Sequence, residues 1–262
     1  MRANSFGKKA AVIGASGAIG HAFLQELLKK GYEHVDAFSR SSFSGRSSTW
    51  LNSIDTRNPG PGIVLNNFKI DVTDESSISQ AIKLAENYDS APYDLIFVAT
   101  GILHQEEENI TPEKSLKAVN LAQLQTVFTA NTFGPILIAK HFIPRLSKAE
   151  KAVFAALGAR VGSIEDNHLG GWYSYRASKA ALNMLLKTLS IETRRTHPAA
   201  IVVSLHPGTV ASHLSSPFQA RVPEDKLFTP TMSAEYLFKV LQKLEVKDTG
   251  KIFAWDGSEI KP

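Results

Sequence analysis

Short apolar runs alternate with longer amphipathic stretches along the whole sequence. The apolar runs predict strands at 10–14, 34–39, 63–70, 93–99, 152–157, 200–205 and 251–254. The stretches between them predict helices near 18–30, 74–88, 113–146, 173–196 and 233–244. This alternation predicts an α/β fold, a doubly wound parallel sheet of about seven strands with helices on both faces. We expect a single domain over 1–262, with a loop or a short distorted helix at 41–62.

Composition limits the classes of protein to which the chain can belong. Its 262 residues, 43% hydrophobic and 21% charged, are ordinary for one globular domain. The net charge of +4 is small and scattered, which suits anionic small molecules and argues against a nucleic-acid partner. The absence of cysteine excludes disulfides and thiol catalysis. Because no apolar segment reaches membrane-spanning length and no cleaved signal is recognisable, we expect a cytoplasmic protein with no membrane partner.

A glycine-rich turn follows the first predicted strand and precedes the first predicted helix. Gly14 permits a tight turn, Gly17 lets the backbone approach a pyrophosphate, and Gly20 allows the helix to pack closely on the strand. The free N–H groups and the positive dipole end of the helix favour phosphate binding. The order of these elements favours a dinucleotide site, although a plain strand-to-helix connection can have the same sequence.

Tyr175 and Lys179 are the most informative pair in the chain. Their i,i+4 spacing on a helix puts an ammonium beside a phenol on one face. A free phenol ionises near pH ~10, and we expect the adjacent cation to lower the pKa of Tyr175 toward the working pH, as a general acid and base requires. Tyr173 has no such partner, because Ala177 stands four residues after it. The same spacing also occurs where an aromatic ring lies in the core and a lysine faces solvent.

Together, the glycine turn and the Tyr175–Lys179 pair resemble the short-chain dehydrogenase/reductase family, in its single-domain form of about 250 residues. The resemblance runs nearly end to end and implies a Rossmann-like fold, closest to the branch with C-factor and sniffer-like carbonyl reductases. Ile13 and Ala18 depart from the family's glycine turn, which usually has Thr and Gly there. By this resemblance the cofactor-binding residues are Gly14, Ser16, Gly17, Ala18, Ile19, Ser39, Arg40, Asp71, Val72, Ala99, Thr100, Gly101, Tyr175, Lys179, Pro207, Gly208, Val210 and Ser212.

The resemblance also implies where parts of the cofactor would bind. Asp71-Val72 matches the pair that holds the adenine. Val98 to Gly101 stands where the family has Asn-Asn-Ala-Gly, and only the glycine matches strictly. The backbone of Pro207-Gly208 would face the nicotinamide carboxamide, with Ser212 where the family often has Thr. A Pro-Gly pair also marks ordinary turns, so this segment has a structural explanation as well.

The family further implies four catalytic residues, which are Asn131, Ser163, Tyr175 and Lys179. Asn131 would anchor a water that leads to Lys179, although a residue before a Gly-Pro pair can simply mark a helix kink. The family serine is the weakest match, because Gly158 and Ala159 stand at its expected place and neither has a hydroxyl. Ser163 is the nearest replacement, and we expect it to donate a hydrogen bond to a substrate carbonyl. A surface-turn serine is the alternative.

Cofactor choice is indicated at the end of the second predicted strand. An acidic residue there would bind the ribose hydroxyls of NAD, whereas an arginine can clamp the 2′-phosphate of NADP. Ser39-Arg40 therefore favours NADP(H) over NAD(H), with a solvated loop arginine as the alternative.

The predicted reaction is hydride transfer between a nicotinamide and the carbonyl of an aldehyde or ketone, or its reversal on the alcohol, with Tyr175 exchanging the proton. We expect substrate contacts from 102–104, 167–172 and 211–230, the last of which resembles the family's mobile lid. The scattered histidines give no metal motif, so we assign no metal site.

Family members pair through long helices, which implies a homodimer or homotetramer here. The residues that could supply apolar area are Leu182, Leu185, Leu186 and Leu189, which can equally cover the sheet. Two other functions stay open. One is a dinucleotide-binding signalling or regulatory protein of the C-factor type with little or no turnover. The other is non-redox use of a bound cofactor, as in sugar epimerases or dehydratases, whose chains are generally longer.

Overall fold

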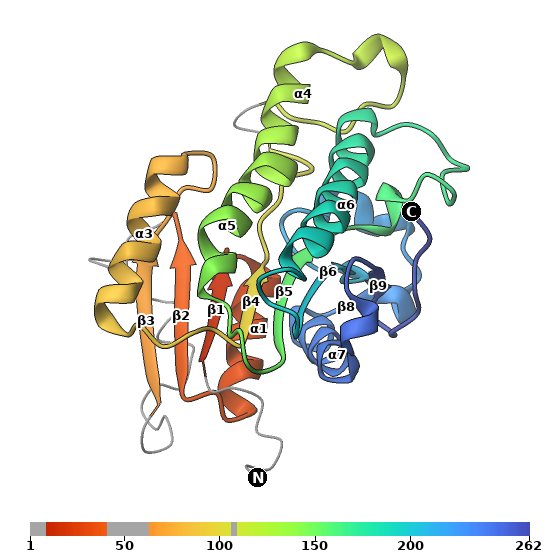
Figure 1. Ribbon diagram of the computed structural model, residues 1–262. Coiled ribbons are helices and arrows are strands. Elements are labelled where there is room, and N and C mark those ends of the chain that lie inside the picture. Colours follow the sequence, from red (N-terminus) through yellow and green to blue (C-terminus); the bar gives the residue numbers. More distant parts are fainter. Residues whose placement is uncertain (1–8, 41–62, 106–108) are drawn as a thin grey trace, which may run out of the picture.

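The computed structural model describes residues 9–40, 63–105 and 109–262. Within these residues a parallel sheet has the strand order β3-β2-β1-β4-β5-β6-β9 (Figure 1). Its strands are β1 (Lys9–Ile13), β2 (His34–Ser39), β3 (Val64–Lys69), β4 (Leu95–Val98), β5 (Ala152–Leu157), β6 (Ala200–His206) and β9 (Ile252–Ala254). The predicted fold class is therefore confirmed. The strand order reverses between β1 and β4, and open α/β sheets bind ligands beside such a point.

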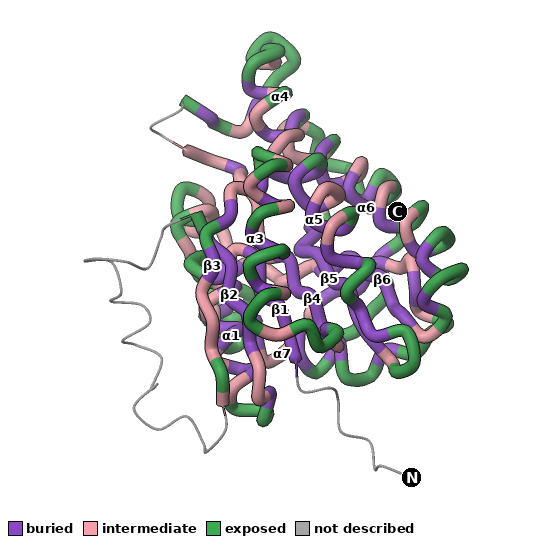
Figure 2. The backbone as a smooth tube through the Cα atoms, turned by 60° about the vertical axis from the view of Figure 1, so that its left-hand side comes forward, coloured by how far each residue is buried: buried purple, intermediate pink, exposed green. Residues whose placement is uncertain are grey.

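Helices cover both faces of the sheet (Figure 1). One face carries α1 (Ala18–Lys29) and α7 (Pro230–Lys243), and the other carries α3 (Glu75–Tyr88), α5 (Gly134–Phe142) and α6 (Tyr173–Thr193). Successive side chains of a strand point to opposite faces, so Val12 joins the first core and Ile13 the second. Apart from the edge strand β3, the strands are buried along most of their length (Figure 2), which explains why most of them appear in the sequence as apolar runs.

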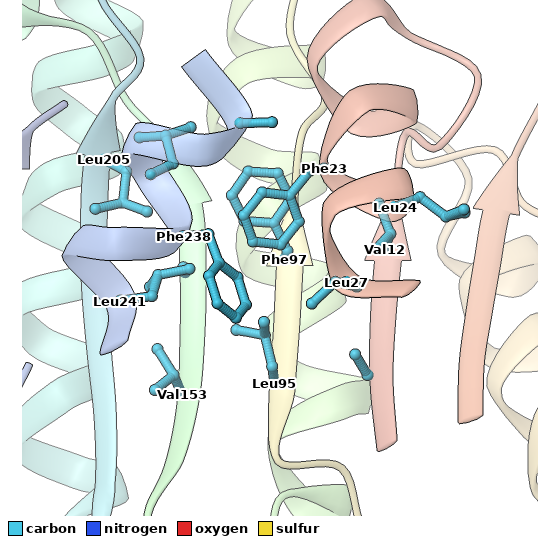
Figure 3. Packing of buried hydrophobic residues seen from close by; sticks show 14 of the residues in the cluster. Val12, Phe23, Leu24, Leu27, Leu95, Phe97, Val153, Leu205, Phe238 and Leu241 are labelled. Carbon is cyan, nitrogen blue, oxygen red and sulfur yellow. The ribbon is translucent and has the colours of Figure 1, made fainter. Parts of the chain in front are cut away.

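Aromatic rings fix α1 and α7 on their face of the sheet. Phe23 of α1 stacks on Phe97 of β4 with ring centroids 3.8 Å apart and planes 16° apart, and Phe238 of α7 lies 6.2 Å from Phe23 (Figure 3). Phe23 and Phe97 are completely buried. Burying a side chain of this size contributes about 1.5–3 kcal/mol. This packing holds the start of α1 at the carboxyl ends of β1 and β4.

The helical stretch expected near 113–146 begins later in the structure and changes its helical form along its length. Residues 113–120 contain only the short 3-10 turn η1 (Leu116–Ala118), and α4 (Leu121–Phe128) begins where the Asn120 side chain accepts a hydrogen bond from the Gln123 N–H at 2.9 Å. The π-helical turn η2 (Thr129–Phe133) separates α4 from α5, and the 3-10 turn η3 (Ile143–Arg145) follows α5. The helical stretch predicted near 113–146 therefore begins later, at Leu121, and runs through α4, η2, α5 and η3 without a break to Arg145.

The segment expected to form a lid, 211–230, contains little regular structure. The 3-10 turns η5 (Ser216–Arg221) and η6 (Glu224–Lys226) lie within it, and α7 begins at its end, at Pro230. A two-stranded pairing of β7 (Thr209–Val210) with β8 (Leu227–Phe228) ties the two ends of the segment together. The remaining 3-10 turns are η4 (Arg160–Gly162) and η7 (Val246–Asp248).

The described ranges contain neither a membrane-spanning helix nor a cluster of metal-binding side chains. Every helix there is too short or too polar to cross a membrane. No group of three or more His, Cys, Asp or Glu side chains there could hold a metal ion. The loop or distorted helix expected at 41–62 lies outside the described residues.

Candidate active site

The glycine-rich turn lies between the carboxyl end of β1 and the start of α1. Gly14 has a positive φ of 84°, which favours glycine, and its N–H donates to the Phe38 carbonyl at 2.9 Å. The Gly17 N–H donates to the Gly14 carbonyl at 3.0 Å. A side chain at Gly20 would collide with the backbone of Gly14. The turn is therefore packed closely against the first residues of α1.

The start of α1 has the properties of an anion site. No side chain caps the helix N-terminus at Gly17. Ser16, Gly17 and Ala18 are exposed, and Ile19 is half-buried. Backbone N–H groups and the positive end of the helix dipole are thus presented to solvent, an arrangement that fits the pyrophosphate of a dinucleotide.

Ser39 and Arg40 lie at the carboxyl end of β2, close to Asp71. Ser39 is buried, whereas Arg40 is exposed. The hydroxyl and backbone N–H of Thr73 donate to the Asp71 carboxylate at 2.6 and 2.9 Å. These bonds, with a smaller contribution from the Arg40 charge, hold the pKa of Asp71 below its usual range. Val72 is buried beside Asp71. The residues expected to meet the adenine half of a cofactor are therefore neighbours.

The acid within β2 does not reach this site. Asp36 is buried inside the sheet, where it accepts hydrogen bonds from the Tyr93 hydroxyl at 2.5 Å and the Asn66 amide at 2.9 Å. The Asp36 carboxylate therefore lies within the sheet, whereas Ser39 and Arg40 lie at the carboxyl end of β2.

Gly101 marks the place where the loop after β4, the π turn and α6 converge. A side chain at Gly101 would lie 3.2 Å from Asn131 Oδ1 and 3.3 Å from Lys179 Nζ. The preceding residues continue the strand direction, since the Ala99 N–H donates to the Ile13 carbonyl at 2.8 Å. Thr100 Oγ1 is buried and has no hydrogen-bond partner within the described residues. Two of the predicted catalytic side chains thus flank one glycine.

Asn131 is fully buried on the π turn. Its Oδ1 accepts from the Ile102 N–H at 2.7 Å, and its Nδ2 donates to the Ile102 carbonyl at 2.8 Å and to the Ser178 hydroxyl at 3.2 Å. Thr132 adds a hydrogen bond from its hydroxyl to the Ser178 carbonyl at 2.8 Å. Single π turns occur frequently at functional sites. Asn131 therefore fastens the loop after β4 to α6, and its link to Lys179 through a water stays a prediction.

Helix α6 carries Tyr175 and Lys179 one turn apart. Lys179 is only 3% exposed, and its Nζ donates to the Leu157 carbonyl at 2.8 Å. The same Nζ lies 5.8 Å from the centre of the Tyr175 ring. The Tyr175 ring is half-buried. The pair expected from the spacing is thus formed at the carboxyl end of β5.

The pKa values of this pair differ from the expectation. Burial raises the pKa of Tyr175 to about 12 and lowers the pKa of Lys179 to about 8. Desolvation disfavours the charged form of each group, and an ammonium 5.8 Å from the ring does not outweigh it for the phenol. The lowering of the Tyr175 pKa by Lys179, expected from the spacing, is therefore not found in this structure.

Ser163 follows the 3-10 turn η4 after β5. It is buried, and its hydroxyl accepts a hydrogen bond from the Asp166 N–H at 3.1 Å. That contact does not use the hydroxyl hydrogen. A side chain at Gly162 would collide with Lys179, so the turn lies directly against α6. Donation from Ser163 to a substrate stays a prediction.

The segment after β6 approaches the lid. Gly208 has a φ of 80°, and a side chain there would collide with the Phe228 ring. Pro207 and Gly208 are half-buried, Val210 is buried in β7, and Ser212 is half-buried at the start of the lid. These four predicted residues lie after the carboxyl end of β6, which is the sheet edge that carries the glycine turn and Gly101.

Glu113 positions the N-terminus of α6, a role that was not predicted from the sequence. Its buried carboxylate accepts hydrogen bonds from the Ser174 backbone N–H at 3.2 Å and from the Ser174 hydroxyl. The Glu113 carbonyl accepts from the N–H of Trp172, which has a left-handed φ of 52°. A carboxylate at a helix N-terminus is favourable because of the helix dipole. Since 61 residues separate Glu113 from Ser174, no local pattern reveals the contact.

Comparison with known proteins gives an independent identification. The model of the short chain dehydrogenase family matches residues 8–222. The 1-hydroxy-2-glutathionyl-2-methyl-3-butene dehydrogenase of Rhodococcus sp. (strain AD45) is 28% identical over 248 residues, which cover 94% of this chain and 96% of that protein. C-signal of Myxococcus xanthus is 30% identical over 146 residues, which cover 56% of this chain and 82% of that protein.

Solved structures agree with this match. The NADPH-bound carbonyl reductase from chicken fatty liver is 28% identical, with a TM-score of 0.82 over 98% of this chain and 100% of that chain. The carbonyl reductase Sniffer of D. melanogaster, 21% identical, has a TM-score of 0.81 over the same shares and supports the fold alone. With its sheet order, glycine turn and Tyr175–Lys179 pair, the chain belongs to the short-chain dehydrogenase/reductase family and is an oxidoreductase that binds a nicotinamide dinucleotide.

Proposed function

We propose that the protein is an NADP(H)-dependent reductase of aldehydes or ketones, which also oxidises the corresponding alcohol. The observation that supports this most is the convergence of Asn131, Lys179 and the backbone of Gly101 beside Tyr175. A bound reduced dinucleotide supplies a hydride. The Tyr175 hydroxyl gives its proton to the carbonyl oxygen as the carbonyl carbon gains that hydride, so the products are an alcohol and the oxidised dinucleotide.

The neighbours of Tyr175 have distinct parts in this proposal. Lys179 hydrogen-bonds the ribose next to the nicotinamide. Asn131 holds the loop after β4 and leads to Lys179 through a water. Ser163 donates its free hydroxyl hydrogen to the carbonyl oxygen, where negative charge develops.

The NADP(H) preference rests on two observations. Arg40 is exposed at the carboxyl end of β2, close to Asp71, and the acid of β2 itself, Asp36, is buried inside the sheet. The chicken reductase, 28% identical to this chain, is NADPH-bound. A guanidinium at this position matches the geometry and charge of a 2′-phosphate.

A regulatory role of the C-factor type is the second candidate. It is favoured by the 30% identity to C-signal, which covers 56% of this chain. The retained Tyr175–Lys179 pair gives the enzymatic function the better support. A cytoplasmic location, a single domain over 1–262 and assembly into a homodimer or homotetramer stay predictions. Leu182 and Leu186 are buried against the sheet, whereas Met184 and Ile191 are exposed on α6, so an interface would use the latter pair.

Replacing Tyr175 by phenylalanine tests the proton donor. Tyr175→Phe keeps the ring and removes the hydroxyl, and we expect kcat for aldehyde reduction to fall by about 100-fold or more. The affinity for NADPH, measured by fluorescence titration, stays close to that of the wild type. Tyr173→Phe is the matched control, because Tyr173 is exposed two residues away, and its kcat should not change. Undiminished turnover in Tyr175→Phe would contradict the mechanism.

Ser163→Ala tests the hydrogen bond to the carbonyl oxygen. Loss of a preorganised donor of this kind lowers kcat by about 100-fold, with little effect on NADPH binding. Steady-state kinetics with a saturating aldehyde measure the effect. If Ser163→Ala retains full turnover while Tyr175→Phe is inactive, the carbonyl donor is another group.

The pH dependence of stability tests the burial of Lys179. Its pKa is 10.5 in the unfolded chain and about 8 in the folded protein, so between these values the unfolded state binds more protons. The free energy of unfolding should therefore rise between pH 8 and 10, by up to about 3 kcal/mol. Above pH 10 Tyr175 opposes this rise, because its pKa is raised in the folded protein and the unfolded state releases its proton first.

Urea unfolding of the wild type and Lys179→Met at pH 7.5, 8.5 and 9.5 measures this slope. The variant should lose the rise with pH, whatever its absolute stability. Equal slopes in the two proteins would show that the Lys179 pKa is not lowered by folding.

Arg40→Ala tests cofactor discrimination. Loss of a charge-assisted contact to the 2′-phosphate should lower kcat/KM for NADPH by about 10- to 100-fold. The value for NADH serves as the internal control and should stay within about twofold, because NADH lacks that phosphate. A wild type with equal kcat/KM for both cofactors would count against the clamp.

A further inference from the structure

Four ring side chains form an arc that begins at Tyr175. The Trp172 and Tyr175 rings meet edge to face with centroids 6.3 Å apart. The ring centroids of Trp172 and Phe218 are 4.9 Å apart. Those of Phe218 and His104 are 6.4 Å apart, with the ring planes at 89°. We call these four residues the aromatic arc. One end of the arc is the proposed proton donor, and the other end is an imidazole.

The arc is assembled from three different loops. His104 follows β4, Trp172 follows β5 and Phe218 follows β6. These three strands are consecutive in the sheet, and substrates of open α/β folds bind beyond the carboxyl ends of the strands. The three loops are those from which substrate contacts are expected, so the rings gather where a substrate would approach Tyr175.

The arc is not part of the closed core. All four rings are half-buried, whereas the stacked core rings Phe23 and Phe97 are completely buried. Each ring of the arc therefore keeps surface that another molecule can cover. Aromatic partners gain more from such contacts than saturated groups of equal size, because offset and edge-to-face ring geometries add to the area buried.

His104 supplies a polar atom at the far end. Its Nδ1 is buried and has no hydrogen-bond partner within the described residues. Leaving a buried polar atom unpaired is costly, and a ligand that hydrogen-bonds to it removes the cost. Depending on its tautomer, the ring nitrogen can donate to or accept from an oxygen.

Building on the proposed reductase function, we propose that the substrate is an aromatic aldehyde or ketone whose ring lies against Phe218 and Trp172. A second oxygen substituent on that ring hydrogen-bonds to His104 Nδ1, while the carbonyl meets Tyr175. The arc thus selects flat aromatic carbonyl compounds over saturated ones of similar size.

Turnover of two matched aldehydes tests the ring preference. Benzaldehyde and cyclohexanecarbaldehyde have similar size but differ in aromaticity, and the measured quantity is the ratio of their kcat/KM values with NADPH. We expect this ratio to fall about fivefold to tenfold in Phe218→Leu, which keeps apolar volume and loses the ring. The different intrinsic reactivity of the two aldehydes cancels when the ratios are compared. Tyr88→Leu, which removes an exposed ring at the end of α3, is the control and should leave the ratio unchanged.

Binding measured without turnover separates this inference from the proposed function. Calorimetric titration of benzyl alcohol and cyclohexylmethanol into NADPH-saturated protein forms complexes in which both ligands are already reduced. We expect tighter binding of benzyl alcohol, with the difference reduced in Phe218→Leu. Ring preference in binding without reduction of either aldehyde supports the arc and contradicts the reductase function. Equal reduction of both aldehydes, with a ratio unmoved by Phe218→Leu, overturns the arc alone, and absence of both preference and turnover overturns both.

The three hydroxybenzyl alcohols test the role of His104 in the same titration. At least one isomer should bind the NADPH-saturated protein about fivefold more tightly than benzyl alcohol, as expected for one additional hydrogen bond. His104→Phe keeps a ring and loses the nitrogen, and it should abolish this gain while the preference for benzyl alcohol over cyclohexylmethanol persists. If no isomer binds more tightly, or if the gain survives in His104→Phe, the second polar contact is wrong.

Discussion

The buried amide of Asn131 is the contact on which the geometry of the site depends. A completely buried amide must be hydrogen-bonded, and Asn131 meets this need with the backbone of Ile102 and the hydroxyl of Ser178. Three elements are thereby joined, namely the loop after β4, the π turn and α6. Gly101 and Lys179 lie on either side of this junction. The backbone beside the proposed cofactor and the helix that carries the proton donor therefore cannot shift independently.

Burial gives this junction its chemical character. Burial disfavours the ionised forms of both Lys179 and Tyr175, since it lowers the pKa of the lysine and raises the pKa of the tyrosine. The carbonyl of Leu157 offsets part of the desolvation of the ammonium. Polar groups held in a fixed and largely desolvated arrangement interact more strongly with charge that develops on a reacting carbonyl than they would in water. The removal of water from these groups thus lowers the stability of the fold and also strengthens their interaction with the developing charge.

The sequence predicted those features whose signals are local. Most sheet strands are short apolar runs, and the glycine turn and the Tyr175–Lys179 pair are spacings within one segment. Contacts between distant segments left no such signal. Glu113 meets Ser174 across 61 residues, and the aromatic arc joins three loops. The π turn escaped prediction for the same reason, because its Asn131 is held by Ile102 and Ser178 and not by its own helix.

The absence of a hydroxyl at Gly158 has a structural cause that involves the neighbouring strand. A side chain at Gly158 would collide with the hydroxyl of Ser204 on β6 and would lie 3.5 Å from Asn183 Oδ1 on α6. Ser204 therefore occupies the space that a side chain from β5 would need, and glycine is required there. The Ser204 hydroxyl and the Asn183 amide are buried without hydrogen-bond partners in the described part of the chain, at a cost of about 1–3 kcal/mol each. Asn183 lies one helical turn after Lys179, so these unpaired polar groups lie beside the proposed reacting groups. Proteins commonly have a lower stability at functional sites for such a reason.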